Sequence, residues 1–393
     1  MNRKQFITQA ALAAVGGVAL STLESCENKL SSPESLGRFY QPYSGAKDDS
    51  RALLNHCIQS AMMAPNPHNT QAWKCQITGP DRCRLFVDKD RILPQTDPTT
   101  RQIHIGQGTF LELFALAAQD SAYEALITLL PEGEYLLTET GSKPVAEIQL
   151  VANPQLAPST LSRYINARST NRSIYKGPGF AEATLAQLAK ESAPNFAEIA
   201  WLPPNQAAAF NAILLQAFAL ETNTRAKHEE TRAWFRYNDQ EIADKRDGLS
   251  LRGNGLSGLK YWAAHTFFLK PGEDNWHAAS SRQAGIAMFE QQLASAQGFL
   301  YLKTKGNSLR DWIQTGRDYA KLNLYLTSKQ LALHPNSQVL QEYPEMRDLQ
   351  KSFNQLLALA PGEHVQMLCR IGSSDFNFIS PRRPWQSIVS EIA

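Results

Sequence analysis

The sequence predicts an α+β fold made of two similar halves in one chain of 393 residues. Stretches with helical periodicity and stretches that alternate like strands follow one another along the chain. Each half holds a long apolar helix, near Gly108 in the first and near Gly316 in the second, and each helix is followed later by a strand. When these two glycines are set against each other, apolar residues such as Phe114 and Leu322 fall into register. We therefore expect the second half to repeat the first with longer insertions.

The composition is that of a folded globular chain. Hydrophobic residues make up 43% and charged residues 19% of the sequence, which excludes a mainly disordered chain. Lys and Arg number 39 against 37 Asp and Glu, and the resulting net charge of +2 gives no sign of a nucleic-acid partner. The chain has 5 cysteines, too few for a disulfide scaffold. We expect Cys57, Cys75, Cys83 and Cys369 to be buried thiols, with a Cys75–Cys83 disulfide as the alternative.

The first residues, 1–26, are expected to be an export signal. Arg3 and Lys4 precede an apolar run of about eleven residues, short of the ~20 that span a bilayer. The start of the chain resembles a twin-arginine (Tat) signal with Lys4 in place of the second arginine, and an ordinary secretory signal is the alternative. Residues 23–26 resemble a bacterial lipobox in which Cys26 carries a lipid, the alternative being cleavage without lipidation. The predicted location is the periplasm, either free or as a lipoprotein whose lipid is its only membrane contact.

The remaining chain divides into a linker and the two halves. A polar linker rich in turn formers is expected at 27–48, followed by a first half at 49–160 and a second half at 161–393. In the first half the patterns predict a helix, a hairpin, a buried helix and a strand, at residues 50–63, 73–88, 108–130 and 145–151. In the second half they predict three helices, a long helix starting near Gly316 and a strand, the three helices at 181–192, 205–222 and 280–303 and the strand at 365–371. A charged, glycine-punctuated insertion occupies about 225–275.

One motif of the first half resembles a family signature. Residues 64–73 read Ala-Pro-Asn-Pro-His-Asn-Thr-Gln-Ala-Trp, which resembles the Ala-Pro-Ser-x-x-Asn-x-Gln-Pro-Trp signature of FMN-dependent nitroreductases. Asn69, Gln71 and the final tryptophan match. Asn66 stands in place of the serine, and Ala72 in place of the second proline. The resemblance implies that Asn66, Asn69 and Gln71 contact the flavin, whose ring edge offers hydrogen-bond donors and acceptors to side-chain amides.

Two motifs of the second half resemble the same family. Residues 168–172, Arg-Ser-Thr-Asn-Arg, are similar to its Arg-x-Ser/Thr-x-Arg flavin-phosphate motif, and Pro-Arg-Arg-Pro at 381–384 is similar to its C-terminal segment, where a basic residue reaches the phosphate. The phosphate of FMN is a dianion that guanidinium groups bind better than ammonium groups do. The resemblance implies phosphate contacts from these residues: Arg168, Ser169, Thr170, Arg172 and Arg383. It also makes Ser337 and Gln338, after the second buried helix, candidates beside the ring.

The distribution of these motifs indicates a duplicated chain. In nitroreductases the flavin site lies between two subunits, one supplying the Asn-x-Gln loop and the other the arginine motif. Here the loop motif occurs only in the first half and the arginine motifs only in the second. The chain therefore resembles the duplicated, single-chain Acg-like branch of the family, in which two fused halves form an intramolecular pseudo-dimer with one composite site. The insertion at 225–275 would be placed as a lid over that site.

The function that this resemblance implies is that of an exported FMN-binding oxidoreductase. It would reduce nitro, quinone or similar small-molecule acceptors by two electrons through flavin N5, with no catalytic side chain and no metal. The alternatives are a flavin-binding protein that sequesters its cofactor with little turnover, and an interaction module that has lost FMN. A Gly-x-Gly-x-x-Gly pattern at 253–258 follows a charged stretch instead of a strand, so a hinge in the insertion is favoured over a dinucleotide site. Monomer and homodimer are both compatible with the sequence.

Overall fold

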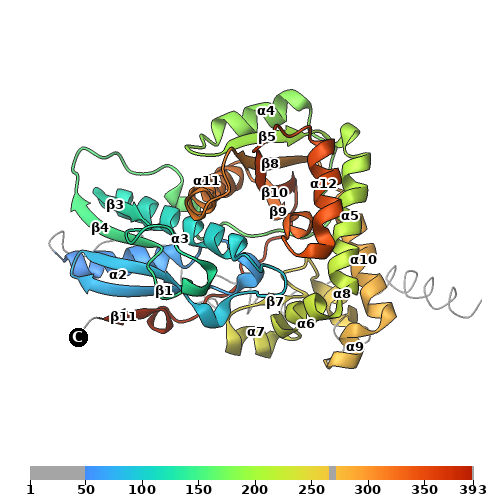
Figure 1. The fold of residues 1–393 in the computed structure, drawn as a ribbon, viewed down its shortest axis with the longest axis horizontal. Coiled ribbons are helices and arrows are strands. Elements are labelled where there is room, and N and C mark those ends of the chain that lie inside the picture. The colour runs from blue at the N-terminus through green and yellow to red at the C-terminus, as the bar shows by residue number, and fades with distance from the viewer. Residues whose placement is uncertain (1–48, 265–270, 392–393) are drawn as a thin grey trace, which may run out of the picture.

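The computed structural model describes residues 49–264 and 271–391. The predictions for the export signal, the lipidation of Cys26 and the linker at 27–48 lie outside these residues. Within them, helices and two larger sheets alternate in the chain, as Figure 1 shows, which confirms the α+β class. In the part of the chain that the structure describes, no helix combines the length and the apolar character needed to cross a membrane.

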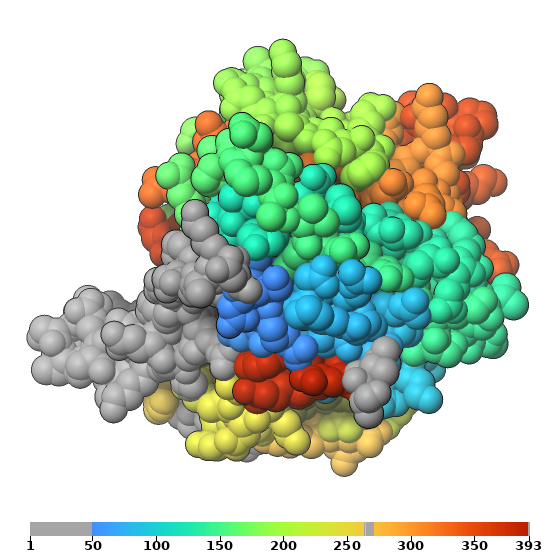
Figure 2. Space-filling view, turned by 90° about the vertical axis from the view of Figure 1, so that its left-hand side faces the viewer, coloured from blue at the N-terminus to red at the C-terminus, as the bar shows by residue number. Residues whose placement is uncertain are grey.

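The first sheet is built mainly from the first half. Its strands lie in the order β11-β1-β2-β4-β3. Helices α2 and α3 pack against each other beside it. The first-half elements are α2 (Ser50–Ala61), β1 (Trp73–Gly79), β2 (Arg82–Val87), α3 (Arg101–Asp120), β3 (Tyr123–Leu129) and β4 (Ala146–Ala152). Strand β11 (Val389–Glu391) comes from the far end of the chain and pairs parallel with β1, so the C-terminal segment closes onto the first half (Figure 2).

The second sheet belongs entirely to the second half. Its strands lie in the order β5-β8-β10-β9. The second-half elements outside the insertion are α4 (Glu182–Glu191), β5 (Glu198–Leu202), α5 (Ala208–Asn223), α10 (Ala279–Ala294), β8 (Gly298–Thr304), α11 (Leu309–Ser328), β9 (Ala332–Pro335), α12 (Arg347–Leu356) and β10 (His364–Gly372). In its described residues the insertion forms four short helices and a two-stranded sheet, namely α6 (Arg225–Ala233), β6 (Phe235–Arg236), α7 (Asp239–Lys245), β7 (Leu249–Ser250), α8 (Gly258–Ala263) and α9 (Glu273–His277). It has a small core of its own, in which Phe235 and Trp276 pack with their ring centroids 5.0 Å apart.

Two helix predictions were wrong because each merged a helix with the strand that follows it. The stretch 108–130 is not one helix, because α3 begins at Arg101 and ends at Asp120, and the rest forms β3 after a left-handed Ala122 (φ 59°). The stretch 280–303 likewise divides into α10 and β8. Strand β8 lies inside its sheet with most of its residues buried, and such a continuous apolar run cannot be distinguished from a buried helix by periodicity.

The start of α11 was also predicted too late. This helix begins at Leu309, so Gly316 lies in its interior and not at its start. Ser308 and Asp311 form a reciprocal cap at its N-terminus, a local signal that marks the true beginning. The hairpin over 73–88 and the strand over 365–371 are confirmed by β1, β2 and β10.

All four cysteines of the described chain are buried and free, as expected. In the β1–β2 hairpin Cys75 lies opposite Leu85 and Cys83 opposite Ile77, so the two thiols are not cross-strand partners. Burial raises the pKa of Cys75 and Cys83, which keeps both thiols protonated and unreactive.

The two halves meet where α3 crosses α11 in the middle of the molecule (Figure 1). The two glycines that the sequence sets against each other lie in contact at this crossing. A Cβ on Gly108 would lie 1.8 Å from the carbonyl oxygen of Ile313, and one on Gly316 would lie 2.0 Å from that of Ile105. Only the absence of side chains lets the helix backbones approach so closely. The main hydrophobic core runs through this crossing and draws residues from both halves.

We predict that Gly316→Ala destabilises the protein by about 3 kcal/mol or more, because the added methyl group overlaps backbone that cannot move aside easily. Denaturant unfolding measures the change. Gly285→Ala in α10 is the matched control, since nothing lies within 4 Å of its Cβ position, and it should be neutral or slightly stabilising. Equal effects of the two substitutions would show that the close crossing is not a constraint on the fold.

Candidate functional site

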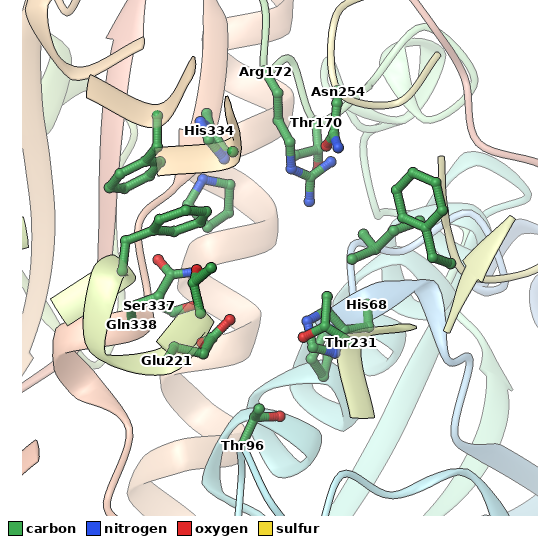
Figure 3. Close-up of a pocket in the computed structure, with 18 of the residues that line it drawn as sticks. His68, Thr96, Thr170, Arg172, Glu221, Thr231, Asn254, His334, Ser337 and Gln338 are labelled. Atoms are coloured by element: carbon green, nitrogen blue, oxygen red, sulfur yellow. The ribbon is translucent and has the colours of Figure 1, made fainter. Parts of the chain in front are cut away.

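Two adjoining cavities lie between the halves and the insertion. The larger has a volume of about 450 Å³ and is lined by the loop before β1, by α3, α5, α6 and α10, and by the segment after β9. The smaller is polar and lies beside it. Residues of both halves line both cavities and so mark their junction, namely Pro65, Asn66, Thr170, Arg172 and Leu249. Figure 3 shows Arg172 projecting into the larger cavity near Thr170 and Asn254.

The smaller cavity is strongly cationic. Three arginines line it, Arg168, Arg172 and Arg382, and no carboxylate is found among its described lining residues. Burial lowers the pKa of Arg168 and Arg172 to about 10 and that of Arg382 to about 9, so all three stay charged at neutral pH. Uncompensated buried charges are costly, and three together indicate a place for an anion.

Arg168 and Arg382 differ in how far their hydrogen bonds are satisfied. Arg382 donates from Nε to the Met62 carbonyl at 2.7 Å and from Nη1 to Asn69 Oδ1 at 2.7 Å, and its Nη2 donates to the Ala64 carbonyl at 3.1 Å. Arg168 donates only from Nη2, to the Met63 carbonyl at 3.1 Å. Its Nε and Nη1 are buried with no partner among the described residues. Two donors of Arg168 are therefore unused, and the residue lines the smaller cavity.

The carbonyls that receive these arginines directly follow α2. Neutral carbonyls at the end of a helix attract a cation without cancelling its charge. A carboxylate in the same place would neutralise the guanidinium and remove its attraction for a ligand. This choice of partner leaves the smaller cavity with a net positive charge.

The loop of residues 65–71 is held in an uncommon shape by α3. His68, Asn69 and Gln71 all have positive φ, at 47°, 52° and 54°. Helix α3 fixes the loop on both sides, because Thr109 donates to the Pro65 carbonyl at 2.7 Å and the Trp73 ring nitrogen donates to the Gly106 carbonyl at 3.1 Å. Such conformations persist when the surroundings determine them, and here they turn the Asn69 side chain toward Arg382.

Most of the site residues predicted from sequence lie on the cavity walls. The smaller cavity is lined by six of them: Asn66, Asn69, Arg168, Ser169, Thr170 and Arg172. Ser337 and Gln338 line the larger one. Asn66 also shapes the loop, since its Oδ1 accepts a hydrogen bond from the Gln71 backbone at 2.8 Å.

Gln71 and Arg383 are not among the described residues that line either cavity. The Gln71 side chain accepts from the Arg383 backbone N–H at 2.8 Å and donates to the Arg246 carbonyl at 2.9 Å. The Arg383 side chain donates to the Gln71 carbonyl at 2.8 Å and lies 3.7 Å from Asp88. The pair connects the loop, the C-terminal segment and the insertion. The arginine that enters the cavity is the preceding residue, Arg382, which sequence reasoning missed because two adjacent arginines offer no local signal for which one turns inward.

The insertion closes over the smaller cavity. Gly248, Ser250 and Gly253 line it, and Arg172 donates to the Gly253 carbonyl at 3.4 Å. The insertion is held to the first half by the buried Asp247, which pairs with Arg91 of that half and, at 2.6 Å, with Arg236 of the insertion.

A fixed hydrogen-bond donor faces the larger cavity from the second half. Arg370 is fully buried, and its Nε donates to His334 Nδ1 at 2.9 Å. Burial and the neighbouring Arg370 and Arg172 hold the pKa of His334 well below its usual value, so the ring is neutral. With Nδ1 accepting, the proton lies on Nε2. His334 lines the cavity, and sequence reasoning missed its partner Arg370, which lies in a strand far from the motifs.

Three residues of the insertion, Glu229, Glu273 and His277, are close enough together to ligate a metal ion. However, Glu229 is paired with Arg232 and Glu273 with Arg225. The Arg232 guanidinium, with His277, lowers the pKa of Glu229 to about 2, and the two arginines already supply the positive charge that a metal would bring. The cluster is therefore explained as a salt-bridge network.

No family model matches the chain. It is similar to "Putative NAD(P)H nitroreductase acg" of Mycobacterium tuberculosis (strain ATCC 25618 / H37Rv), with 33% identity over 79 residues that make up 20% of this chain and 24% of that protein. The chain thus spans about a quarter of the length of the curated relative that it matches.

Two solved structures are also similar, and both proteins are named nitroreductases. The FMN and NADPH-dependent nitroreductase NfnB from sphigopyxis sp. strain HMH has 14% identity and a TM-score of 0.36, over 59% of this chain and 98% of that one. The FMN-dependent nitroreductase NfnB from Mycobacterium smegmatis in complex with NADPH has 15% identity and a TM-score of 0.34, over 57% and 94%. TM-scores this low do not establish a shared fold.

Because Arg382 makes more hydrogen bonds than Arg168, we predict that removing each arginine changes the free energy of unfolding in the opposite direction. In phosphate-free buffer, with the cavity emptied of any bound small molecule, Arg168→Met should raise the free energy of unfolding by about 1 kcal/mol, because a buried charge with two unpaired donors is removed. Arg382→Met, the matched control, should lower it by about 3 kcal/mol, because the bonds to Asn69 and the α2 carbonyls are lost. Denaturant unfolding distinguishes the two, and a large loss for Arg168→Met would make that residue structural.

Proposed function

We propose that this chain is an FMN-binding oxidoreductase of the nitroreductase family. The single observation that carries the proposal is the buried guanidinium of Arg168 with two unused donors, which lies beside Arg172 and Arg382 in the wall of the smaller cavity, next to a cavity of about 450 Å³. A phosphate attached to a flat, largely apolar group fits that pair of cavities. The resemblance of the sequence motifs supports FMN as this ligand, and the name of the similar mycobacterial protein supports a nitroreductase.

The residues present fit the two ends of FMN. Arg168, Arg172 and Arg382 would bind the phosphate dianion with the hydroxyl of Thr170, in a cavity without a competing carboxylate. The ring would extend past Arg172 into the larger cavity, where His334 offers an N–H that stays neutral and donating over the physiological pH range.

A bound flavin would supply the redox chemistry, a two-electron transfer through N5 to a small nitro, quinone or similar acceptor. This chain's own residues bind and orient the cofactor and the acceptor. NAD(P)H is the proposed electron donor, because the similar mycobacterial protein is named for it. Loop 65–71 of the first half and the arginines of the second would act on one flavin, which is the composite site of a fused pseudo-dimer. We further propose that the protein is exported by the N-terminal signal.

A second candidate function, flavin sequestration with little turnover, has one observation in its favour. Insertion residues line the phosphate end of the site and are tied to the first half through Asp247 and Arg91. Turnover with NADPH and menadione separates the two functions. A protein that retains FMN and oxidises NADPH only when menadione is present is an oxidoreductase. Retention with no oxidation favours sequestration.

The phosphate assignment predicts the flavin content of variants. The wild-type protein should retain FMN through desalting, and Arg168→Met/Arg172→Met should bind it at least about 100-fold more weakly, since each charged hydrogen bond contributes about 1.5–3 kcal/mol. The visible absorption of the desalted protein and titration with FMN measure this. Arg163→Met is the matched control, because Arg163 is exposed in the same segment over the Tyr164 ring and should not affect binding. Equal FMN affinity of the double variant and the control would refute the phosphate assignment.

A further inference from the structure

We propose that Glu221 is the residue that gives a proton to the electron acceptor, and that the far end of the larger cavity selects neutral, planar acceptors of the quinone class. This inference rests on the proposed function. It concerns the acceptor and not the flavin, and it depends on three observations: the position of Glu221, the state of its carboxyl group and the walls around it.

Glu221 lies near the C-terminal end of α5 and lines the larger cavity. Figure 3 shows it on one wall near Ser337 and Gln338, facing the wall that carries His68 and Thr231. Among the described residues lining this cavity it is the single acidic one. Glu221 is only 6% exposed, so its carboxyl group can contact a molecule in the cavity but little bulk solvent.

The carboxyl group of Glu221 has one hydrogen-bonding neighbour and no paired cation. Gln341 Nε2 donates to Glu221 Oε2 at 2.5 Å, and no salt bridge to Glu221 occurs within residues 49–264 and 271–391. An ionised carboxylate with a single donor in such a place is strongly disfavoured, whereas a protonated one has an O–H free to donate into the cavity.

The charged groups on the neighbouring elements do not reverse the preference of the Glu221 carboxyl for its protonated form. From α6, Lys227 lies over the Tyr343 ring at 4.1 Å and pairs with Glu345, while Glu230 accepts from Thr96 at 2.7 Å. Burial, with a smaller effect of Glu230, raises the pKa of Glu221 to about 7, and Gln341 and Lys227 oppose the shift.

The other packed elements bring no compensating charge to this carboxyl. The charged residues of α12 are exposed on the outer surface, as is Glu290 of α10. Arg282 of α10 lines the cavity without a salt bridge to Glu221. The carboxyl is therefore protonated below neutral pH and available to donate.

The walls around Glu221 are aromatic. Phe218 and Phe289 stack with their centroids 4.2 Å apart and both line the cavity, as do Phe235 and Trp276. Aromatic walls suit a flat ring, and a single neutral O–H suits a carbonyl oxygen that accepts a hydrogen bond. A quinone carbonyl offers both features.

The reduced flavin and Glu221 together supply the two electrons and two protons that convert a quinone to a hydroquinone. Two electrons and one proton reach the quinone as hydride from the reduced flavin, and the second proton leaves the Glu221 carboxyl for a quinone carbonyl oxygen. The hydride would form the first O–H bond, at one quinone oxygen, as its bond to the flavin breaks. The O–H bond of Glu221 would break as the second O–H bond forms at the other oxygen, and both C=O π bonds would be lost to give the hydroquinone. Glu221 is left as a carboxylate and is reprotonated from solvent before the next turnover.

The test compares Glu221→Gln with the wild-type holoprotein and with Glu345→Gln. Glutamine keeps an oxygen for the Gln341 bond but cannot lose a proton. Glu345 is an exposed carboxylate in the same neighbourhood, so its substitution controls for the change of charge alone. Flavin absorption, infrared difference spectra and single-turnover oxidation of the reduced protein by menadione are measured across pH 5 to 9.

We expect the infrared signal of a protonated carboxyl in the wild type at pH 5, its loss with a midpoint near pH 7, and its absence in Glu221→Gln. We also expect the wild-type rate of menadione reduction to fall above that midpoint. The Glu221→Gln rate should be about 100-fold lower at pH 6 and independent of pH, in the range usual for loss of a general acid. Glu345→Gln should behave as the wild type does.

The outcomes separate this inference from the proposed function. If Glu221→Gln retains FMN and keeps the wild-type rate and pH profile, the proton-donor role is overturned and the proposed function stands. A wild-type protein without the carboxyl signal overturns the role even if the variant does not fold. A wild-type protein that binds no FMN overturns the proposed function, which the absorption spectrum reveals before any rate is measured.

Discussion

The contact between the backbones of α3 and α11 at Gly108 and Gly316 is the constraint on which the site depends. It lets the two halves share one core, and it fixes α3, whose residues on either side of Gly108 hold the loop of residues 65–71. The same crossing brings Tyr319 of α11 to the cavity wall. A wider separation of these helices would move the loop of residues 65–71 away from the arginines of the second half. Both halves are therefore needed to form the site.

The arginines of the smaller cavity lower the stability of the fold, because their positive charges are buried without carboxylate partners, but the same charges would attract an anion. Arg168 and Arg382 donate hydrogen bonds to backbone carbonyls and not to carboxylates. These bonds hold the guanidinium groups in place without neutralising their charge. Two donors of Arg168 remain unused, which costs folding free energy, and the proposed phosphate would complete their hydrogen bonds. Glu221 is the counterpart in the larger cavity, a carboxyl kept without a cation at the other end of the same space.

Local pattern was sufficient for elements whose neighbours along the chain decide their structure. The hairpin at β1 and β2, helices α2, α4 and α5, and strand β10 follow the predicted ranges closely. It was insufficient at α3 and at β8, where burial on nearly all sides removes the polar positions that reveal the period, so the neighbouring β3 and α10 were merged with them. The family resemblance located the loop and the arginine motif, since both are short and contiguous in sequence.

The sequence alone brought Arg168, Thr170 and Arg172 to one cavity, because the three residues lie in one short segment, and the family resemblance makes them the proposed phosphate ligands. Only the tertiary structure decided that Arg382 and not Arg383 enters the cavity, that Gln71 faces the C-terminal segment, and that Glu221 lies without a counterion. The reason is physical. The direction of a side chain and the charge state of a buried group depend on partners that are hundreds of residues away in sequence, and no local pattern records them.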